Sequence, residues 1–386
     1  MSDLSALVKE TPVAAGLKHR IVEVTDHAEL ARHVQPWEQL IEQIAEPNVF
    51  YAPWALLPAV RHLRGGQAVR VLLFYQDAER GQLDGVIPLF ERTCGGFPAL
   101  LHAYQHRYCF LCEPLLRPGR EAEVAETFVT WLHQRRFRWP LLRLCGLDGN
   151  GLWLPRLEAA LEAGRVHFRR TRTLQRALLR TGGDLQAYLA HIPAKKRREY
   201  RRLRERLAEQ GELRVDVLQP GAADLQVWLD QFVTLEARGW KGREGTALGS
   251  RPACRQFFEE TAHSFHQRGR LMMLRMTLDG RPLAMSCDFL GPPGRYAFKT
   301  AYDEDYSRYA PGVLLELENA CLAFESGLQW LDSCAAPDNE MINRIYPDRR
   351  TLVDLTVCPL GAARGVLWLA ARLKQLRQRW RASGSP

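Results

Sequence analysis

One order of segments occurs twice in this chain and limits what it can fold into. Three stretches rich in β-forming residues are followed by a stretch with helical spacing and then by another β-rich stretch. This order covers residues 69–151 and again residues 270–338. Strands that alternate with helices are typical of α/β proteins. Because the copies share little residue identity and lie far apart, we predict a duplicated α/β unit and not a short-period solenoid.

The boundary between the two units is expected near residue 183. Gly182 and Gly183 interrupt the apolar pattern, and Asp184 directly after them is a favourable helix N-cap. We therefore predict an N-terminal unit at residues 1–183 and a C-terminal unit at residues 184–386. At 386 residues, of which 46% are apolar, the chain is long enough for two hydrophobic cores.

Charge and hydropathy restrict where the chain can work. Lys and Arg number 53 against 44 Asp and Glu, which gives a formal net charge of +9. That excess suits a phosphorylated cofactor, a nucleic acid or a membrane surface, without choosing among them. No apolar run reaches the roughly 18 residues of a spanning helix, and the first residues lack the layout of a signal peptide. We therefore expect a cytoplasmic protein.

The nine cysteines are scattered and mostly lie inside apolar runs, where a buried reduced thiol is expected. Cys109 and Cys112 form a C-x-x-C pair, but no second pair accompanies them. A zinc site normally needs four such ligands. The sequence therefore predicts no metal site.

A Pro-Gly pair stands at the start of the helical stretch in the second copy, which continues over residues 313–327. The first backbone amides of a helix are unpaired, and with the helix dipole they favour a phosphate. The residues predicted to form such an anion site are Lys299, Arg308, Pro311, Gly312, Val313 and Leu314. The alternative is an ordinary strand-to-helix turn without a ligand.

The corresponding helix of the first copy begins differently. Glu121 and Glu123 fall in its opening turn, where their charges would repel an anion. Of the two units, the second is therefore the better candidate for a phosphate site.

Motifs along the chain carry a resemblance to a known family. They are LEARGWKGREGTA at 235–247, FKTAYDEDYSRYAPGVLL at 298–315 and DSCAAPDNEMI at 332–342, and FYAPWALLPA at 50–59 agrees with them. The chain resembles the CelD-like branch of the GNAT acyltransferase superfamily, the cellulose or exopolysaccharide biosynthesis acetyltransferases. The resemblance implies two tandem GNAT-like units, akin to the FemABX peptidyltransferases, each with a mixed central sheet flanked by helices. The GNAT pyrophosphate signature is incomplete, since RYAPGV at 308–313 keeps one of its glycines.

The resemblance also implies an activity and its participants. The C-terminal unit, which ends in a basic helix, would transfer an acyl group from acetyl-CoA or another acyl-CoA. The N-terminal unit would be non-catalytic. The Pro-Gly corner would hold the pyrophosphate of the donor, and the thioester would lie where the preceding strand separates from the one at 328–338. The acceptor would be an amine or hydroxyl of a small molecule, a sugar or a polysaccharide precursor.

Candidate catalytic residues lie in the same motifs. Acyl transfer to an amine needs a deprotonated nucleophile, so a carboxylate is expected nearby. The candidates for this base are Glu236, Asp332 and Asp338. Tyr302 is a candidate proton donor to the leaving thiolate, although such tyrosines often pack in a core. The residues expected at the acceptor are Trp240, Lys241 and Cys334.

Simpler interpretations exist for parts of this site. The segment from Glu236 to Lys241 also fits a helix C-terminus with a packed tryptophan. A thiol nucleophile at Cys334 has little support, because no histidine lies near it in the sequence. Direct attack by the acceptor is the simpler mechanism.

Two basic segments leave other functions open. Residues 195–206 and 364–382 each combine an apolar helical stripe with basic residues. Each fits a helix that packs on the fold, while the first also suits RNA or an anionic polymer and the second a membrane surface. No RNA-binding motif accompanies them, so we expect no nucleic-acid partner. The alternatives are an aminoacyl-tRNA-dependent FemABX-like transferase, and a non-catalytic module of a polysaccharide-synthesis complex at the inner face of the membrane.

Overall fold

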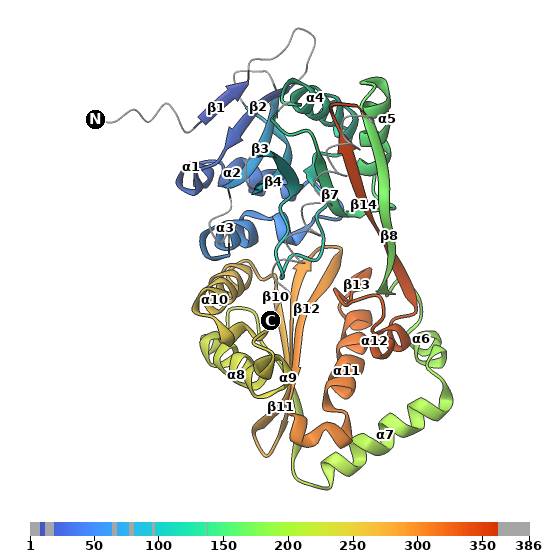
Figure 1. The fold of residues 1–386 in the computed structure, drawn as a ribbon. Coiled ribbons are helices and arrows are strands. Elements are labelled where there is room, and N and C mark those ends of the chain that lie inside the picture. Colours follow the sequence, from blue (N-terminus) through green and yellow to red (C-terminus); the bar gives the residue numbers. More distant parts are fainter. Residues whose placement is uncertain are drawn as a thin grey trace, which may run out of the picture.

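The computed structural model describes residues 8–11, 19–63, 68–76, 81–94, 97–136 and 138–361. Its strands form one 14-stranded mixed sheet that runs through both halves of the chain, with helices on its faces (Figure 1). The strand order is β1-β2-β3-β4-β5-β7-β14-β8-β13-β12-β11-β10-β9, with β6 beside β4. The basic segment at 364–382 lies outside the described residues.

The first half of the chain builds one side of this sheet. Its strands are β1 (Val8–Thr11), β2 (His19–Val24), β3 (Ala68–Gln76), β4 (Leu83–Cys94), β5 (Phe97–Ala103), β6 (Leu115–Leu116), β7 (Leu142–Asp148) and β8 (His167–Arg180). Its helices are α1 (His27–Ala31), α2 (Val34–Ile41), η2 (Val49–Tyr51), α3 (Pro53–His62), α4 (Glu121–Gln134) and α5 (Trp153–Ala163). β3, β4 and β5 are antiparallel neighbours, and β7, after α4, pairs with β5 in parallel.

The second half repeats this arrangement. Its strands are β9 (Leu213–Val217), β10 (Leu271–Leu278), β11 (Arg281–Gly291), β12 (Gly294–Tyr302), β13 (Trp330–Asp332) and β14 (Asp348–Cys358). Its helices are α6 (Leu185–His191), α7 (Ala194–Ala208), α8 (Leu225–Arg238), α9 (Trp240–Arg243), η3 (Leu248–Ser250), α10 (Pro252–His266), η4 (Glu304–Tyr309), α11 (Pro311–Glu325) and α12 (Glu340–Ile345). β10, β11 and β12 are antiparallel, and β13, after α11, is parallel to β12. The predicted α/β fold with a mixed sheet is confirmed.

Two long strands join the halves. β14, the last strand of the described chain, pairs with β7 of the first half and with β8. β8 in turn pairs with β13 of the second half. In Figure 1 these two strands run side by side along the right side of the upper half of the picture, down to β13. Each half therefore completes its part of the sheet with a strand from the other side of the chain.

Both faces of the second half of the sheet are covered. Neighbouring residues of β10 point to opposite faces, as expected for a strand. Met273 packs with Phe232 and Phe258 of α8 and α10 in one core, while Leu274 packs with Leu315 of α11 in another. β12, in the same part of the sheet, likewise contacts α8 and α11.

The third β-rich stretch of the first copy, for which the sequence predicts a strand over residues 99–111, forms a strand only at its start. β5 ends at Ala103, and the chain then leaves the sheet although Tyr104, Tyr108 and Cys109 stay buried. Tyr108 stacks on Phe257 of α10 with ring centroids 5.4 Å apart. Aromatic packing against the second half thus replaces pairing within the sheet, and it brings this segment to the site.

Candidate functional site

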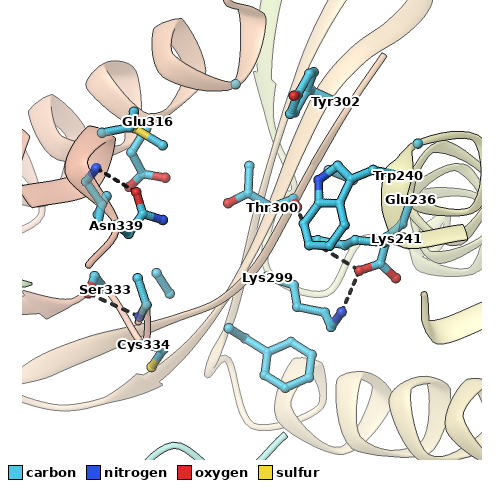
Figure 2. Close-up of a pocket in the computed structure, with 18 of the residues that line it drawn as sticks. Glu236, Trp240, Lys241, Lys299, Thr300, Tyr302, Glu316, Ser333, Cys334 and Asn339 are labelled. Carbon is cyan, nitrogen blue, oxygen red and sulfur yellow. Dashed lines mark hydrogen bonds and ion pairs between the residues drawn. The ribbon is translucent and has the colours of Figure 1, made fainter. Parts of the chain in front are cut away.

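A cavity of about 810 Å³ lies where β12 and β13 separate. The two strands pair only over Gly294–Tyr296, opposite Trp330–Asp332. β12 then continues to Tyr302, while the chain after β13 leads to α12. The cavity surrounds this part of β12, with labelled side chains on both sides of the strand (Figure 2). Groups from opposite faces of the sheet therefore line one space.

Three charged side chains meet on the face covered by α8 and α9. Glu236 on α8 has an exposed fraction of only 2%. Lys299 Nζ, from β12, lies 2.5 Å from Glu236 Oε1, and Lys241 Nζ lies 3.4 Å from the same oxygen. Lys241 Nζ also donates a hydrogen bond to the Thr300 carbonyl at 2.8 Å. Two ammonium groups thus converge on one buried carboxylate (Figure 2).

The other oxygen of this carboxylate is also held. Glu236 Oε2 accepts a hydrogen bond from the backbone N–H of Leu248 at 2.7 Å. Burial and the neighbouring charge of Lys299 lower the pKa of Lys241, and Glu236 opposes that shift. A cavity group with a lowered pKa is a candidate for proton transfer.

The short turn between α8 and α9 explains the WKG sequence. A Cβ atom at Gly242 would lie 1.8 Å from the carbonyl oxygen of Ala237, so only glycine fits. The N–H of Trp240 donates to Glu304 Oε1 at 2.6 Å, which fixes the start of α9. The Trp240 side chain is 45% exposed at the cavity. This turn places Lys241 against the buried carboxylate.

Glu316 lines the cavity from the opposite face, on α11, with an exposed fraction of 4%. The Tyr346 hydroxyl donates a hydrogen bond to its Oε1. Burial and the nearby charge of Asp288 raise the pKa of Glu316 to about 7. Arg295 Nε lies 3.3 Å from Asp288 Oδ2. The charge of this buried arginine also lowers the pKa of Glu316 and so opposes part of the rise. Glu316 can therefore exchange a proton near neutral pH.

The Pro-Gly corner begins α11 at the cavity wall. Ala310 caps this helix with a left-handed φ of 51°. Its carbonyl accepts hydrogen bonds from the amides of Val313 at 3.0 Å and Leu314 at 3.1 Å. Contrary to expectation, these two amides are not free donors, because the first carbonyl of the helix already uses them. Pro311 has no N–H, so the Gly312 amide is the donor at this corner that no described group occupies.

The remaining residues of the predicted anion site are dispersed. From that set, the cavity is lined by Lys299, Gly312 and Val313. Arg308 is exposed and stacks over the Tyr309 ring at 4.8 Å, outside the lining. Pro311 and Leu314 are buried in the packing of α11. The corner lies beside the cavity, but local sequence could not show which side chains face it.

Among the three predicted bases, Glu236 alone lines the cavity. Asp332 is fully buried, and its Oδ2 accepts from Arg176 at 2.7 Å and from Arg350 at 2.9 Å. Although burial opposes it, these two charges lower the pKa of Asp332. Asp338 is exposed on the loop before α12, outside the lining. The structure therefore separates the three carboxylates that the sequence grouped together.

Cys334 and Tyr302 both line the cavity. Cys334 has a φ of 51°, and its N–H donates to Asp332 Oδ1 at 2.9 Å. Burial and the charge of Asp332 raise the pKa of Cys334, which disfavours the nucleophilic thiolate. His263 and His266 contact the carbonyls of residues 259 and 222 instead.

Several lining residues were missed from the sequence. They are Arg107, Tyr108, Glu316, Ser333 and Asn339. Glu316 carried a usable signal, an acid inside the apolar run VLLELENA. The segment with Tyr108 carried none, because long-range packing brings it to the cavity.

Some functional elements are not found in the part of the chain that the structure describes. Its histidines, cysteines and acids include no group of three or more that could hold a metal ion. None of its helices combines the length and hydrophobicity needed to cross a bilayer.

The sequence of the second half matches a known domain family. Residues 194–340 match the family described as Acetyltransferase (GNAT) domain. This range contains α7 to α11, β9 to β13 and the residues that converge on the cavity from α8, α9 and β12. The second half thus carries a GNAT acyltransferase domain. A comparison with curated proteins found no match.

Solved structures share the fold over most of the chain. FemX superposes with a TM-score of 0.56 at 10% identity, covering 84% of this chain and 95% of that chain. A conserved protein of unknown function from Bacteroides thetaiotaomicron superposes with a TM-score of 0.52 at 12% identity, covering 84% of this chain and 97% of that chain. L-PGS from Bacillus licheniformis superposes with a TM-score of 0.52 at 13% identity, covering 94% of this chain and 99% of that chain. At such low identity these similarities show the fold alone.

Proposed function

We propose that this chain is an acyl-CoA-dependent acyltransferase, with acetyl-CoA as the simplest donor. The observation that carries the proposal is the cavity at the separation of β12 and β13, inside the segment that matches the GNAT domain. Glu236, Lys241 and Lys299 converge on one side of it, and the start of α11 lies on the other. Donor and acceptor can therefore meet across the edge of one strand.

The cavity suits an acyl-CoA as donor substrate. Its volume of about 810 Å³ is within the range of ligand sites. The Gly312 amide at the start of α11 favours an anionic group such as the pyrophosphate. A Cβ atom at Gly312 would lie 3.3 Å from the Tyr302 ring, so glycine keeps the approach to this amide open. The acyl arm would then extend along β12.

The acceptor is placed on the α8 and α9 side. Its amine or hydroxyl would give a proton to Glu236, directly or through water, and attack the thioester carbonyl. A bond from the nucleophile to the acyl carbon forms and the carbon–sulfur bond breaks. The cationic groups of Lys241 and Lys299 would stabilise the developing oxyanion. Tyr302, which lines the cavity, is the candidate that returns a proton to the thiolate.

Asp332 has a positioning role in this scheme. It is clamped by Arg176 and Arg350 and holds the amide of Cys334, so it fixes the loop that forms one cavity wall. Through the family resemblance, we propose a sugar or polysaccharide precursor as acceptor. The reaction would take place in the cytoplasm or at the inner face of the membrane.

A second candidate is aminoacyl transfer from tRNA. It is favoured by α7, whose Lys195, Arg198 and Arg202 are exposed while Tyr200 and Leu207 are buried beneath them. The fold shared with FemX also allows it. Neutralisation of RNA phosphates by this helix would make binding fall steeply as salt rises. Tight, salt-dependent binding of tRNA would support this candidate over acyl-CoA.

The test of acyl transfer is a thiol-release assay. The purified chain is incubated with acetyl-CoA and a panel of amino sugars and sugar alcohols, and free CoA is detected with a thiol reagent. Acceptor-dependent release that is lost in Glu236→Gln supports the proposal. The outcome against it is an absence of binding to acetyl-CoA and to longer acyl-CoAs by calorimetry, which would favour a non-catalytic binding module.

A further inference from the structure

A second cavity, of about 530 Å³, is lined mainly by the first half of the chain, with residues 334–337, 352 and 354 from the second half. β5 and β7 pair in parallel only at Leu101 with Leu142 and at His102 with Arg143. Beyond that point they separate, and the cavity is lined by the residues that follow on both strands. This is the relationship that β12 and β13 show at the first cavity. The two cavities therefore occupy equivalent places in the two halves.

The two cavities share part of their walls. Phe110 and the loop Cys334–Ala336 line both of them. Asp332 holds this loop through the Cys334 amide, and Arg176, which lines the second cavity, holds Asp332. A molecule in the second cavity therefore lies next to the first across one loop.

The second cavity is lined with arginines. They are Arg92 from β4, Arg143 from β7, and Arg172 and Arg176 from β8. The one carboxylate in its described lining is Asp354, which lies 3.5 Å from Arg143 and also accepts from the Gly146 amide. Positive charge is therefore in excess.

Part of this charge has no protein partner. Arg92 and Arg172 are exposed and make no ion pair with any described residue. Arg176 is 3% exposed; it donates to Asp332 and the Phe110 carbonyl, but its Nε has no hydrogen-bond partner in the described structure. A buried polar atom without a partner is uncommon and points to a missing ligand or water.

We propose that the second cavity binds an anionic group of the acceptor, a phosphate or a carboxylate. Guanidinium groups recognise both with paired hydrogen bonds, and several arginines around one cavity set the site for such a ligand. Apolar lining from Phe90, Leu174 and Leu352 would hold the body of the molecule. The nucleophile would then reach the first cavity past the shared loop. The role as acceptor rests on the proposed acyl transfer, whereas anion binding does not.

The test is calorimetry on the full chain with CoA present in excess, so that the first cavity is filled. The probes are glucose 1-phosphate, glucuronate and uncharged glucose. We expect a charged probe to bind at least tenfold more tightly than glucose. Whether the phosphate or the carboxylate binds better identifies the charged group of the acceptor. Equal binding of all three probes, or no binding, would overturn the proposal.

A pair of variants locates the site. The double variant with Arg92→Ala and Arg172→Ala should bind the charged probe at least tenfold more weakly than wild type. Arg169→Ala is the matched control, because this exposed arginine of β8 lies outside the cavity lining. Arg169→Ala should bind the charged probe with the affinity of wild type. Thermal unfolding of each variant checks that it folds. Unchanged affinity in the folded double variant would place the anion elsewhere and refute the site.

The result is separable from that of the proposed function. If no acyl-CoA binds but the probes bind through Arg92 and Arg172, acyl transfer fails and the anion site stands. If acyl-CoA binds and the probes do not, the anion site fails and acyl transfer stands.

Discussion

Lys299 Nζ lies 2.5 Å from Glu236 Oε1, and this ion pair ties β12 to α8 at the wall of the first cavity. The pair is buried, with side-chain exposures of 11% and 0%. Lys241 approaches the same oxygen, so the carboxylate has two cationic neighbours. These contacts fix the carboxylate at the cavity wall, where it is the candidate to receive a proton from the acceptor.

Glu236→Gln should lower turnover by about a hundredfold or more, because the amide cannot accept the proton of the nucleophile. Affinity for acetyl-CoA should stay near wild type, since Glu236 faces the acceptor side. The measurement is steady-state release of CoA, with calorimetry for the donor. Glu244→Gln, at an exposed residue outside the cavity lining, is the control and should behave as wild type. Normal turnover in Glu236→Gln would assign proton removal to water or another group.

Gly312→Asp should weaken acetyl-CoA binding at least tenfold, about 1.4 kcal/mol, by adding bulk and negative charge at the one available amide of the corner. Gly312→Ala separates the two effects, because its Cβ adds bulk against the Tyr302 ring but no charge. Gly312→Ala should therefore lose less affinity for acetyl-CoA than Gly312→Asp. Calorimetry with acetyl-CoA on both variants measures the two losses. Equal affinities for wild type and a folded Gly312→Asp would remove the corner from the donor site.

Asp332→Asn should destabilise the protein by about 3 kcal/mol or more, because it leaves Arg176 and Arg350 buried without their shared carboxylate. Urea unfolding measures the change, and Asp338→Asn, at an exposed position, is the control. The native pKa of Asp332 is lowered. Its stabilising contribution is therefore present above the ordinary aspartate pKa and is lost as pH falls through the lowered value. Equal stability of the two variants at neutral pH would contradict this.

Glu316 should give a pH-dependent stability of the opposite sign. Its pKa rises from 4.5 to about 7 on folding, so between these values the folded state keeps a proton that the unfolded state has lost. The free energy of unfolding should therefore fall as pH rises through this window, by about 3 kcal/mol from this group.

The variant Glu316→Gln removes that dependence. Its stability relative to wild type should improve between pH 4.5 and pH 7 by about the same 3 kcal/mol. Urea unfolding at several pH values measures it, with Glu325→Gln, at an exposed position of the same helix, as control. A constant difference between Glu316→Gln and wild type at all pH values would show that the carboxyl keeps an ordinary pKa.

Local sequence predicted the repeated order of strands and helices because alternation, helix caps and turns are local signals. Asp184 caps α6 as expected, with Oδ2 3.0 Å from the Ala187 amide. The pairing of β14 with β7 and β8 could not be predicted, since it joins strands that are far apart in the sequence, such as Leu352 with Asp148, and has no local pattern.

The same distinction holds at the site. The motif residues Glu236 and Lys241 do reach one cavity, together with Lys299. Asp332 was grouped with them by its motif, but it is buried against Arg176 of β8 and Arg350 of β14. Which carboxylate faces a cavity is decided by such tertiary contacts and not by sequence spacing.

The most direct test of the central claim is a crystal structure of the protein with CoA bound. The account predicts the pantetheine arm between β12 and the loop Ser333–Ala336, and the pyrophosphate beside the Gly312 amide. CoA bound in the second cavity, or at any place away from the separation of β12 and β13, would contradict it.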